Sequence, residues 1–180
     1  MRIAPCPCGN ESKRVPGGHS RTAARELELG ALTEHCDRAG SKATIKASGP
    51  REDILALPQV YPADAFLTLY HQGHPAAAAL LTDADPLFWP QAAPGTSGYL
   101  HKLSVRRAYA GQGLAQRLIC LTGILCNNEG KSYLRLDCDA SRQKLIALYQ
   151  SAGFTCLGVR AVQTRRYGTV RAALFRRALA

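Results

Sequence analysis

The stretch Gly98-Tyr-Leu-His-Lys-Leu-Ser-Val-Arg-Arg-Ala-Tyr-Ala-Gly-Gln-Gly-Leu-Ala115 predicts a strand, a tight turn and a helix start in direct succession. The strand would run from Tyr99 to Val105. Alternate side chains of a strand point to the same face, so we expect Tyr99, His101, Leu103 and Val105 to lie together on one face. The basic segment 106–112 would then turn the chain.

Two glycines close this turn, and leucines follow them with the period of an amphipathic helix at positions 114, 118, 121 and 125. Glycine lets the backbone approach a ligand closely, and the free N–H groups of a first helical turn point at an anion. The helix dipole adds about 0.3–1 kcal/mol at an exposed site. The stretch therefore predicts a phosphate-binding turn.

Two common phosphate loops are excluded by the residues present. A P-loop needs lysine and a hydroxyl residue at the helix start, where this chain has Leu114 and Ala115. The dinucleotide fingerprint needs a third glycine, where this chain has Gln116.

The remaining pattern resembles motif A of the GCN5-related N-acetyltransferases (the GNAT family), in which a Leu-x-Val strand precedes a Gln/Arg-x-x-Gly-x-Gly/Ala loop. Leu103-Ser104-Val105 and the segment 110–115 occupy these places, with Ala110 where the family has glutamine or arginine. The resemblance implies that the loop holds the pyrophosphate of the co-substrate acetyl-CoA and that the strand offers backbone groups to its pantetheine arm. The implied cofactor-binding residues are Leu103, Ser104, Val105, Ala110, Gly111, Gln112, Gly113, Leu114 and Ala115.

A second strand and helix are predicted downstream. Apolar and polar residues alternate over residues 133–138, as in a half-buried strand. Ser141 is then expected to cap a helix that ends at Gly153.

This helix carries a second resemblance to the same family. Leu145-x-x-x-Tyr149-x-x-x-Gly153-Phe154 is similar to the signature Leu-x-x-x-Tyr-x-x-x-Gly-Phe, in which the tyrosine protonates the departing CoA thiolate. Arg142 stands where the family often has asparagine. The resemblance implies Tyr149 as general acid; the alternative is a packed helix tyrosine.

His101 is the candidate general base, because histidine titrates near neutral pH. The run 99–105 resembles the His-x-His-x-Leu-Ala-Val strand of the arylalkylamine acetyltransferases, whose histidines relay the substrate proton; only the second histidine is present here. The alternative is a structural histidine with its hydrogen bonds satisfied. Asp137 could also act as a base, or it could anchor the end of its strand.

The loop 83–90 carries Phe88 and Trp89, which either line a pocket or cover the edge of the sheet. The sequence shows no acidic cluster near Tyr99. We therefore expect an aromatic or modestly charged acceptor.

The rest of the chain completes a fold pattern. A helix is expected between Ser20 or Thr22 and Arg38, a short helix at 52–57, and hairpins at 65–71 with 76–81 and at 155–162 with 169–177. This order is that of an α/β (α+β) chain with the GNAT-like acyl-CoA N-acyltransferase fold, a mixed, mostly antiparallel splayed sheet flanked by helices. Residues 1–19 would form an N-terminal tail or a first strand, and residues 20–180 a single N-acetyltransferase domain.

The cysteines bear on metal content and compartment. Cys6 and Cys8 form a short-spaced pair, but a tetrahedral zinc site needs four ligands, so we expect no metal. Seven cysteines without regular spacing fit a reducing compartment better than a disulfide framework. With no apolar run of about 18 residues and no secretory signal, we expect a cytoplasmic protein without membrane contact.

The net charge of +10 is unevenly distributed. Residues 1–100 hold 9 Lys and Arg against 10 Asp and Glu, whereas residues 101–180 hold 14 against 3. The basic half contains the phosphate-binding turn and could hold an anionic nucleotide. The same excess could serve RNA, or could reflect only an arginine-rich surface.

The leading hypothesis is an acetyl-CoA-dependent N-acetyltransferase that acts on a small amine or a protein amino group by direct attack. One alternative is an acyltransferase toxin directed at aminoacyl-tRNA, which the basic charge of residues 101–180 favours. Another is a degenerate member that binds CoA or a partner without catalysis. Ala110 and Arg142, which depart from the family's motifs, favour this alternative. A homodimer would be common for a fold of this size.

Overall fold

The structure is a computed structural model that describes residues 25–28, 57–165 and 167–179. The tail 1–19 with its cysteine pair lies outside the described residues, as do residues 52–56 of the expected short helix. Residues 57–60 form a helical turn.

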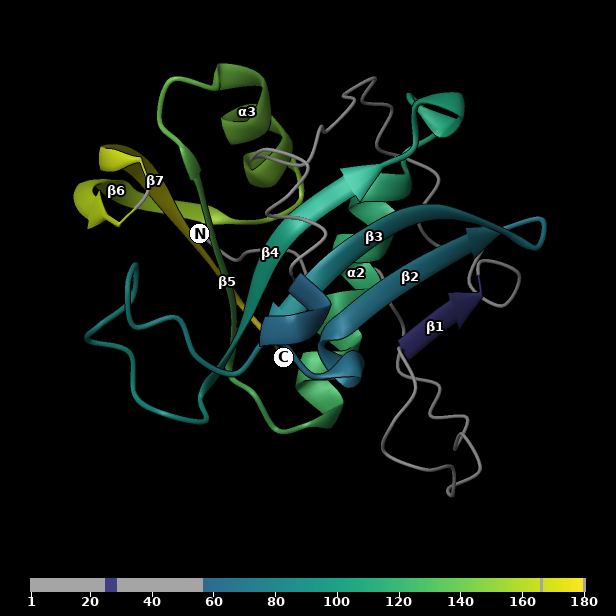
Figure 1. The fold of residues 1–180 in the computed structure, drawn as a ribbon, viewed down its shortest axis with the longest axis horizontal. Coiled ribbons are helices and arrows are strands. Elements are labelled where there is room, and N and C mark those ends of the chain that lie inside the picture. Colours follow the sequence, from purple (N-terminus) through teal and green to yellow (C-terminus); the bar gives the residue numbers. More distant parts are fainter. Residues whose placement is uncertain (1–24, 29–56, 166, 180) are drawn as a thin grey trace, which may run out of the picture.

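Seven strands form one mixed sheet in the order β1-β2-β3-β4-β5-β7-β6 (Figure 1). Their bounds are β1 Arg25–Glu28, β2 Phe66–His71, β3 His74–Thr82, β4 Ser97–Val105, β5 Tyr133–Asp139, β6 Thr155–Thr164 and β7 Gly168–Ala178. The helices are α2 Leu114–Asn128 and α3 Gln143–Ser151, with short 3-10 turns η2 Ala63–Ala65 and η3 Arg107–Tyr109. Among the strands of the described residues, only the pairs β1–β2 and β4–β5 are parallel, so the expected mixed, mostly antiparallel sheet is confirmed.

Both predicted hairpins form. The β2–β3 turn places Gln72 at φ 52° and Gly73 at φ 73°, the positive angles that a tight two-residue hairpin turn requires at both central positions. Strands β6 and β7 pair from Thr155 opposite Arg176 to Thr164 opposite Gly168.

The centre of the sheet opens between β4 and β5. The two strands pair only through Ser97–Tyr99 with Tyr133–Arg135, and beyond these residues they diverge (Figure 1). On its other edge β4 stays paired with β3 as far as Val105. The edges of β4 and β5 that face the opening therefore keep backbone groups without a strand partner.

A bulge in β4 overturns one expectation. Lys102 has φ 53°, and the β3–β4 register shifts so that Ala78 faces Ser104 but Leu80 faces His101. The extra residue reverses the alternation of side chains. The prediction that Tyr99, His101, Leu103 and Val105 share a face is therefore wrong.

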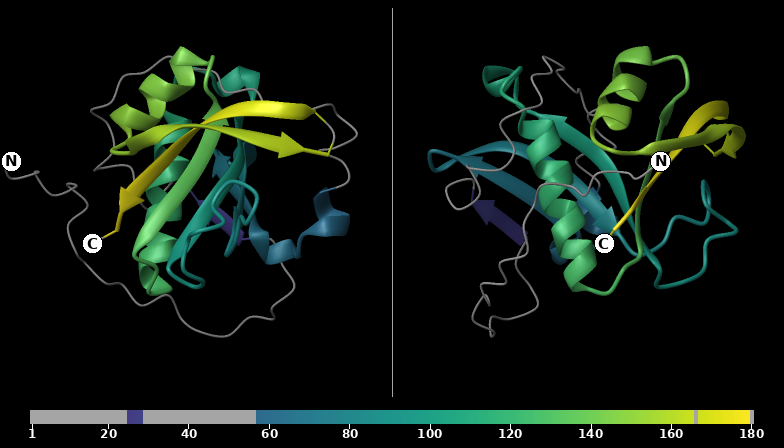
Figure 2. Two further views of the ribbon diagram at one scale, coloured as in Figure 1. Left: turned by 90° about the vertical axis from the view of Figure 1, so that its left-hand side faces the viewer. Right: turned by 180° about the vertical axis from the view of Figure 1, so that it is seen from behind.

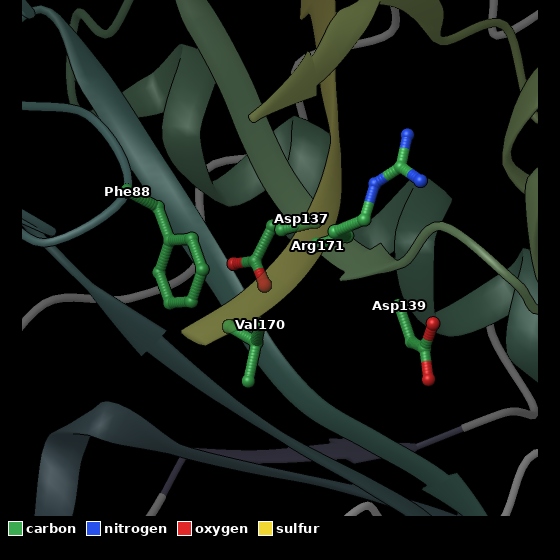
Figure 3. Close-up of a pocket in the computed structure, with 6 residues that line it drawn as sticks. Phe88, Asp137, Asp139, Val170 and Arg171 are labelled. Carbon is green, nitrogen blue, oxygen red and sulfur yellow. The ribbon is translucent and has the colours of Figure 1, made fainter. Parts of the chain in front are cut away.

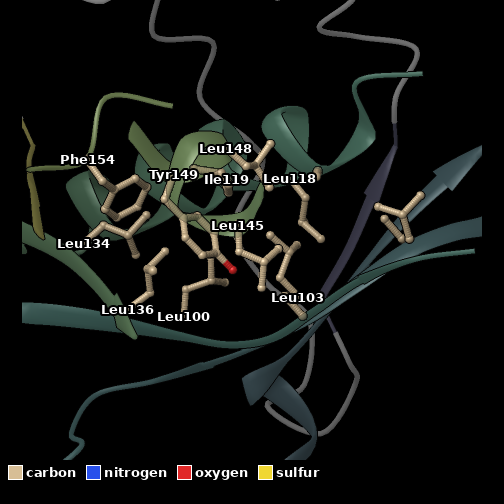
Figure 4. Close-up of a cluster of buried hydrophobic side chains, with 14 of the residues drawn as sticks. Leu100, Leu103, Leu118, Ile119, Leu134, Leu136, Leu145, Leu148, Tyr149 and Phe154 are labelled. Carbon is tan, nitrogen blue, oxygen red and sulfur yellow. The ribbon is translucent and has the colours of Figure 1, made fainter. Parts of the chain in front are cut away.

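The core lies between the sheet and the two helices, which cover the same face (Figures 2 and 4). One buried cluster joins Leu100 and Leu103 of β4 to the apolar sides of α2 and α3. Gly98 allows this close approach, because a Cβ there would collide with the sulfur of Cys126 on α2. The guanidinium of Arg177 on β7 binds the carbonyl oxygens of Ile119 and Ala152, at 3.2 Å each, and so ties both helices to the sheet.

Two local predictions fail for reasons that lie outside their segments. Arg25–Glu28, inside the expected helix of residues 20–38, is instead strand β1, because its backbone pairs in parallel with the edge of β2. Ser141 does not cap α3. Its backbone N–H and its hydroxyl both donate to Oδ1 of Asp139, each at 2.8 Å, and Arg142 stands at the N-cap without a side-chain bond.

Within the described ranges, no helix has the length and apolar character needed to cross a bilayer.

Candidate active site

Residues predicted from the sequence lie around the opening between β4 and β5. Leu103 and Val105 are buried in the core, and their backbone lies along the open edge of β4. Ser104 turns to the other side, where its hydroxyl approaches the Ala78 carbonyl at 3.4 Å.

The glycine turn leads directly into α2. Gly113 is the N-cap with φ 72°, and no side chain caps this helix end. A Cβ on Gly113 would meet nothing within 4 Å, so the space beside it is open. Leu114 and Ala115 bury their side chains and fix the helix start, while Gly111 and Gln112 are exposed. The first N–H groups of α2 are thus available to an anion.

The turn before these glycines is basic. Ala110 ends the 3-10 turn η3, with its N–H bound to the Arg107 carbonyl at 3.2 Å. Arg106 and Arg107 are exposed, and Arg106 donates to the Pro75 carbonyl at 3.1 Å. Positive charge beside an uncapped helix start favours phosphate.

Tyr149 reaches the opening from the helix-covered face. Its ring packs against Phe154 and Phe175, with ring centroids 6.1 and 5.6 Å away. Its hydroxyl points towards Leu100 and Leu103 of β4 (Figure 4). Burial raises the pKa of Tyr149 above its ordinary value, so the phenol keeps its proton at neutral pH.

His101 lies on the opposite face. Its Nε2 is 3.1 Å from the Thr82 hydroxyl, which donates its one proton to the Ala84 carbonyl. The hydroxyl can then only accept, so Nε2 carries the ring proton and Nδ1 keeps its lone pair. Burial lowers the pKa of His101, which keeps the ring neutral.

Two carboxylates complete a cluster with His101. Ligand-type atoms of Asp85, His101 and Asp137 all lie within 4.8 Å of one another. Asp85 accepts the Phe88 N–H at 3.2 Å through Oδ1, and its Oδ2 is buried with no hydrogen-bond partner among the described residues. Burial, followed by the charge of Asp85, raises the pKa of Asp137 from 3.8 to about 7. His101 and Asp137 lie close enough to share one proton. Three such groups could also hold a divalent cation, one ligand short of a closed tetrahedral zinc site.

A pocket of about 230 Å³ opens beside the cluster (Figure 3). It is lined by Phe88, Asp137, Asp139, Val170, Arg171 and Ala172. Phe88 therefore lines a pocket, whereas Trp89 is buried with the guanidinium of Arg135 4.8 Å from its ring centre.

Asp85 was not among the residues predicted from the sequence, although it lies in one cluster with His101 and Asp137. Asp85 lies 16 positions before His101, and only the folding of the loop brings the two together. A weak local signal was present. Asp85-Pro86 is a turn-initiating pair, and the Trp89 N–H does bind the Asp85 carbonyl at 2.8 Å.

Comparison with known proteins gives consistent results. A sequence model of the Acetyltransferase (GNAT) family matches residues 31–154. The protein described as uncharacterized N-acetyltransferase YesJ, from Bacillus subtilis (strain 168), is 34% identical over 88 residues, which are 46% of this chain and 48% of that protein. The chain thus matches about half the length of that relative.

Solved structures share the fold at low identity. A GNAT family acetyltransferase from Elizabethkingia anophelis with acetyl-CoA bound has a TM-score of 0.56 at 14% identity, covering 74% of this chain and 86% of that one. The ribosomal-protein-S18-alanine N-acetyltransferase from Escherichia coli has a TM-score of 0.51 at 20% identity, covering 77% and 95%.

The ionisation of Asp137 predicts a pH-dependent stability. Its raised pKa means that, between about pH 4 and 7, the unfolded chain releases a proton that the folded chain keeps, so stability falls as pH rises. Asp137→Asn removes this loss, and relative to the parent it should gain up to about 4 kcal/mol between pH 4 and pH 8. Urea unfolding across this range measures the difference. A difference that stays constant with pH contradicts the raised pKa.

Proposed function

The chain belongs to the acetyltransferase (GNAT) family, and we propose that it transfers the acetyl group of acetyl-CoA to the amino group of an acceptor. The observation that carries the proposal is the opening between β4 and β5. An uncapped helix start borders it, a protonated tyrosine reaches it from one face, and a proton-accepting cluster reaches it from the other.

The residues of the turn fit the co-substrate of the family. Residues 110–115 would hold the pyrophosphate through backbone N–H groups, with Gly113 leaving room beside it. The unpartnered edge of β4 at Leu103–Val105 would hold the pantetheine arm. Acetyl-CoA supplies an acetyl group activated as a thioester.

The two proton transfers of the reaction would take place on opposite faces of the sheet. His101, in one cluster with Asp137, would take the proton from the attacking amine through Nδ1. Tyr149 would give its proton to the thiolate that leaves as the amide bond forms, and bulk water restores both groups. A group with a pKa of about 7, such as Asp137, is well matched to this task at neutral pH.

The carboxylates around the pocket bear on the choice between a tRNA acceptor and an amine without phosphate groups. Asp85, Asp137 and Asp139 would repel the phosphates of a tRNA acceptor, so we favour an amine. A degenerate member would bind acetyl-CoA without turnover. An assay for released CoA thiol over a panel of primary amines distinguishes the two outcomes.

Gly113→Glu should weaken acetyl-CoA binding at least about tenfold, because it places a negative charge at the anion-binding end of α2. Gly130→Glu is the matched control. It has φ 73° against 72° for Gly113, equally open space, and a position at the other end of the helix. Calorimetric titration of both variants measures the effect. Equal affinities for acetyl-CoA would place the pyrophosphate elsewhere.

Tyr149→Phe should lower kcat by about 10²-fold or more while acetyl-CoA affinity changes little, since the ring contacts remain and only the proton donor is lost. Tyr133→Phe, at the paired end of β5, is the control and should keep kcat. Steady-state kinetics and titration provide the two readouts. Unchanged turnover in Tyr149→Phe means that another group protonates the thiolate.

His101→Asn should lower kcat/KM at pH 7 by about 10²-fold and displace the acidic limb of its pH profile. His74→Asn, an exposed histidine at the hairpin turn, should leave the profile as it is. If both profiles match the parent, His101 is structural and Asp137 alone is the candidate base.

A further inference from the structure

We propose that the acceptor carries a second positive charge about 7 Å from its reactive amine, as in a linear diamine, and that Asp139 binds this second charge. The inference rests on the proposed acetyl transfer and names the substrate class of the same site.

The first observation is the placement of two carboxylates in one pocket. Asp137 and Asp139 both line it, and both lie on the face of β5 opposite the buried Leu136 and Cys138. Residues two apart on a strand are separated by about 6.7 Å. Asp137 belongs to the cluster with His101, so the reactive amine lies there and Asp139 marks a second position at that distance.

The two carboxylates differ in environment. Asp139 is exposed, and its Oδ1 accepts two hydrogen bonds from Ser141. These bonds lower the pKa of Asp139, so it stays ionised. Asp137 is half-buried and shares a cluster with His101, the candidate base. The inner carboxylate is therefore suited to deprotonate an amine, and the outer one to hold an ammonium that stays charged.

Apolar groups lie between and beside these positions. Asp139 pairs with Ala172 on β7, which places Ala172 and Val170 on the carboxylate face of the sheet. With the Phe88 ring opposite, they offer a surface for a chain of roughly four or five methylene groups, the length that spans the two carboxylates.

Positive groups also lie near the pocket. Arg171 lines the pocket, but its guanidinium points away from Phe88, Val170 and Asp137 (Figure 3). Lys102 acts on both His101 and Asp137. Arg142 acts on Asp139, and the Arg160 guanidinium donates to the Phe88 carbonyl at 3.4 Å, but neither arginine lines the pocket.

Acetyl transfer to such an acceptor forms one bond, breaks one bond and moves two protons. The free amine nitrogen forms a bond to the acetyl carbon as the carbon–sulfur bond breaks. Its proton passes to the His101–Asp137 pair, and the thiolate takes a proton from Tyr149. The second ammonium keeps its proton at Asp139 throughout.

The test compares kcat/KM for 1,4-diaminobutane and 1,5-diaminopentane with butylamine and pentylamine. Because an exposed charge pair is weak, we expect about a two- to fivefold preference for the diamines. 1,2-Diaminoethane, too short to reach both carboxylates, should show no preference over ethylamine. Salt should weaken the preference for the longer diamines.

Asp139→Asn should remove the preference and leave the monoamine values within about twofold. Its amide oxygen can still accept both bonds from Ser141, which preserves the local fold. Asp64→Asn, on the turn η2 and outside the pocket lining, is the control and should keep the preference. Equal rates for diamines and monoamines, or an unchanged preference in Asp139→Asn, overturn the inference but leave acetyl transfer intact. Absence of acetyl-CoA binding and of any amine acetylation overturns both.

Discussion

The separation of β4 from β5 after three paired residues is the constraint on which the rest of the site depends. A continuous sheet would bury its central backbone and leave no passage between its faces. Here Tyr149 reaches the opening from the helix side, and His101 reaches it from the other. The bulge at Lys102 makes this division possible, because it keeps Leu100 and Leu103 in the core while His101 points away.

Local sequence signals predicted the elements whose causes are local. The strand through Tyr99–Val105, the glycines before Leu114 and the Gln72-Gly73 turn each follow from signals within a few residues, and all three form, although the bulge at Lys102 breaks the expected alternation of the strand. Strand β1 differs, because its hydrogen bonds belong to an edge of the sheet that lies some 40 positions later in the chain. A helical pattern in that segment could not reveal the competing partner.

The residues of the candidate site likewise separate into those that a local signal identifies and those that depend on contacts between distant segments. Motif resemblance singled out Tyr149 and the glycine turn, whose roles depend on the ends of single helices. Asp85 and the tautomer of His101 depend on contacts between separate segments, and the key partner Thr82 lies on another strand. The raised pKa of Asp137 is likewise a property of burial, which the residue sequence of one strand does not encode.

The unpaired edges of β4 and β5 have a consequence for the protein's fate in the cell. A ligand that bridges them completes the hydrogen bonding of the sheet and binds only the folded chain. Its binding free energy is then added to the folding free energy, about 2.7 kcal/mol at a hundred times its dissociation constant. Resistance to proteolysis would therefore follow the supply of that ligand, which under the proposed function is acetyl-CoA.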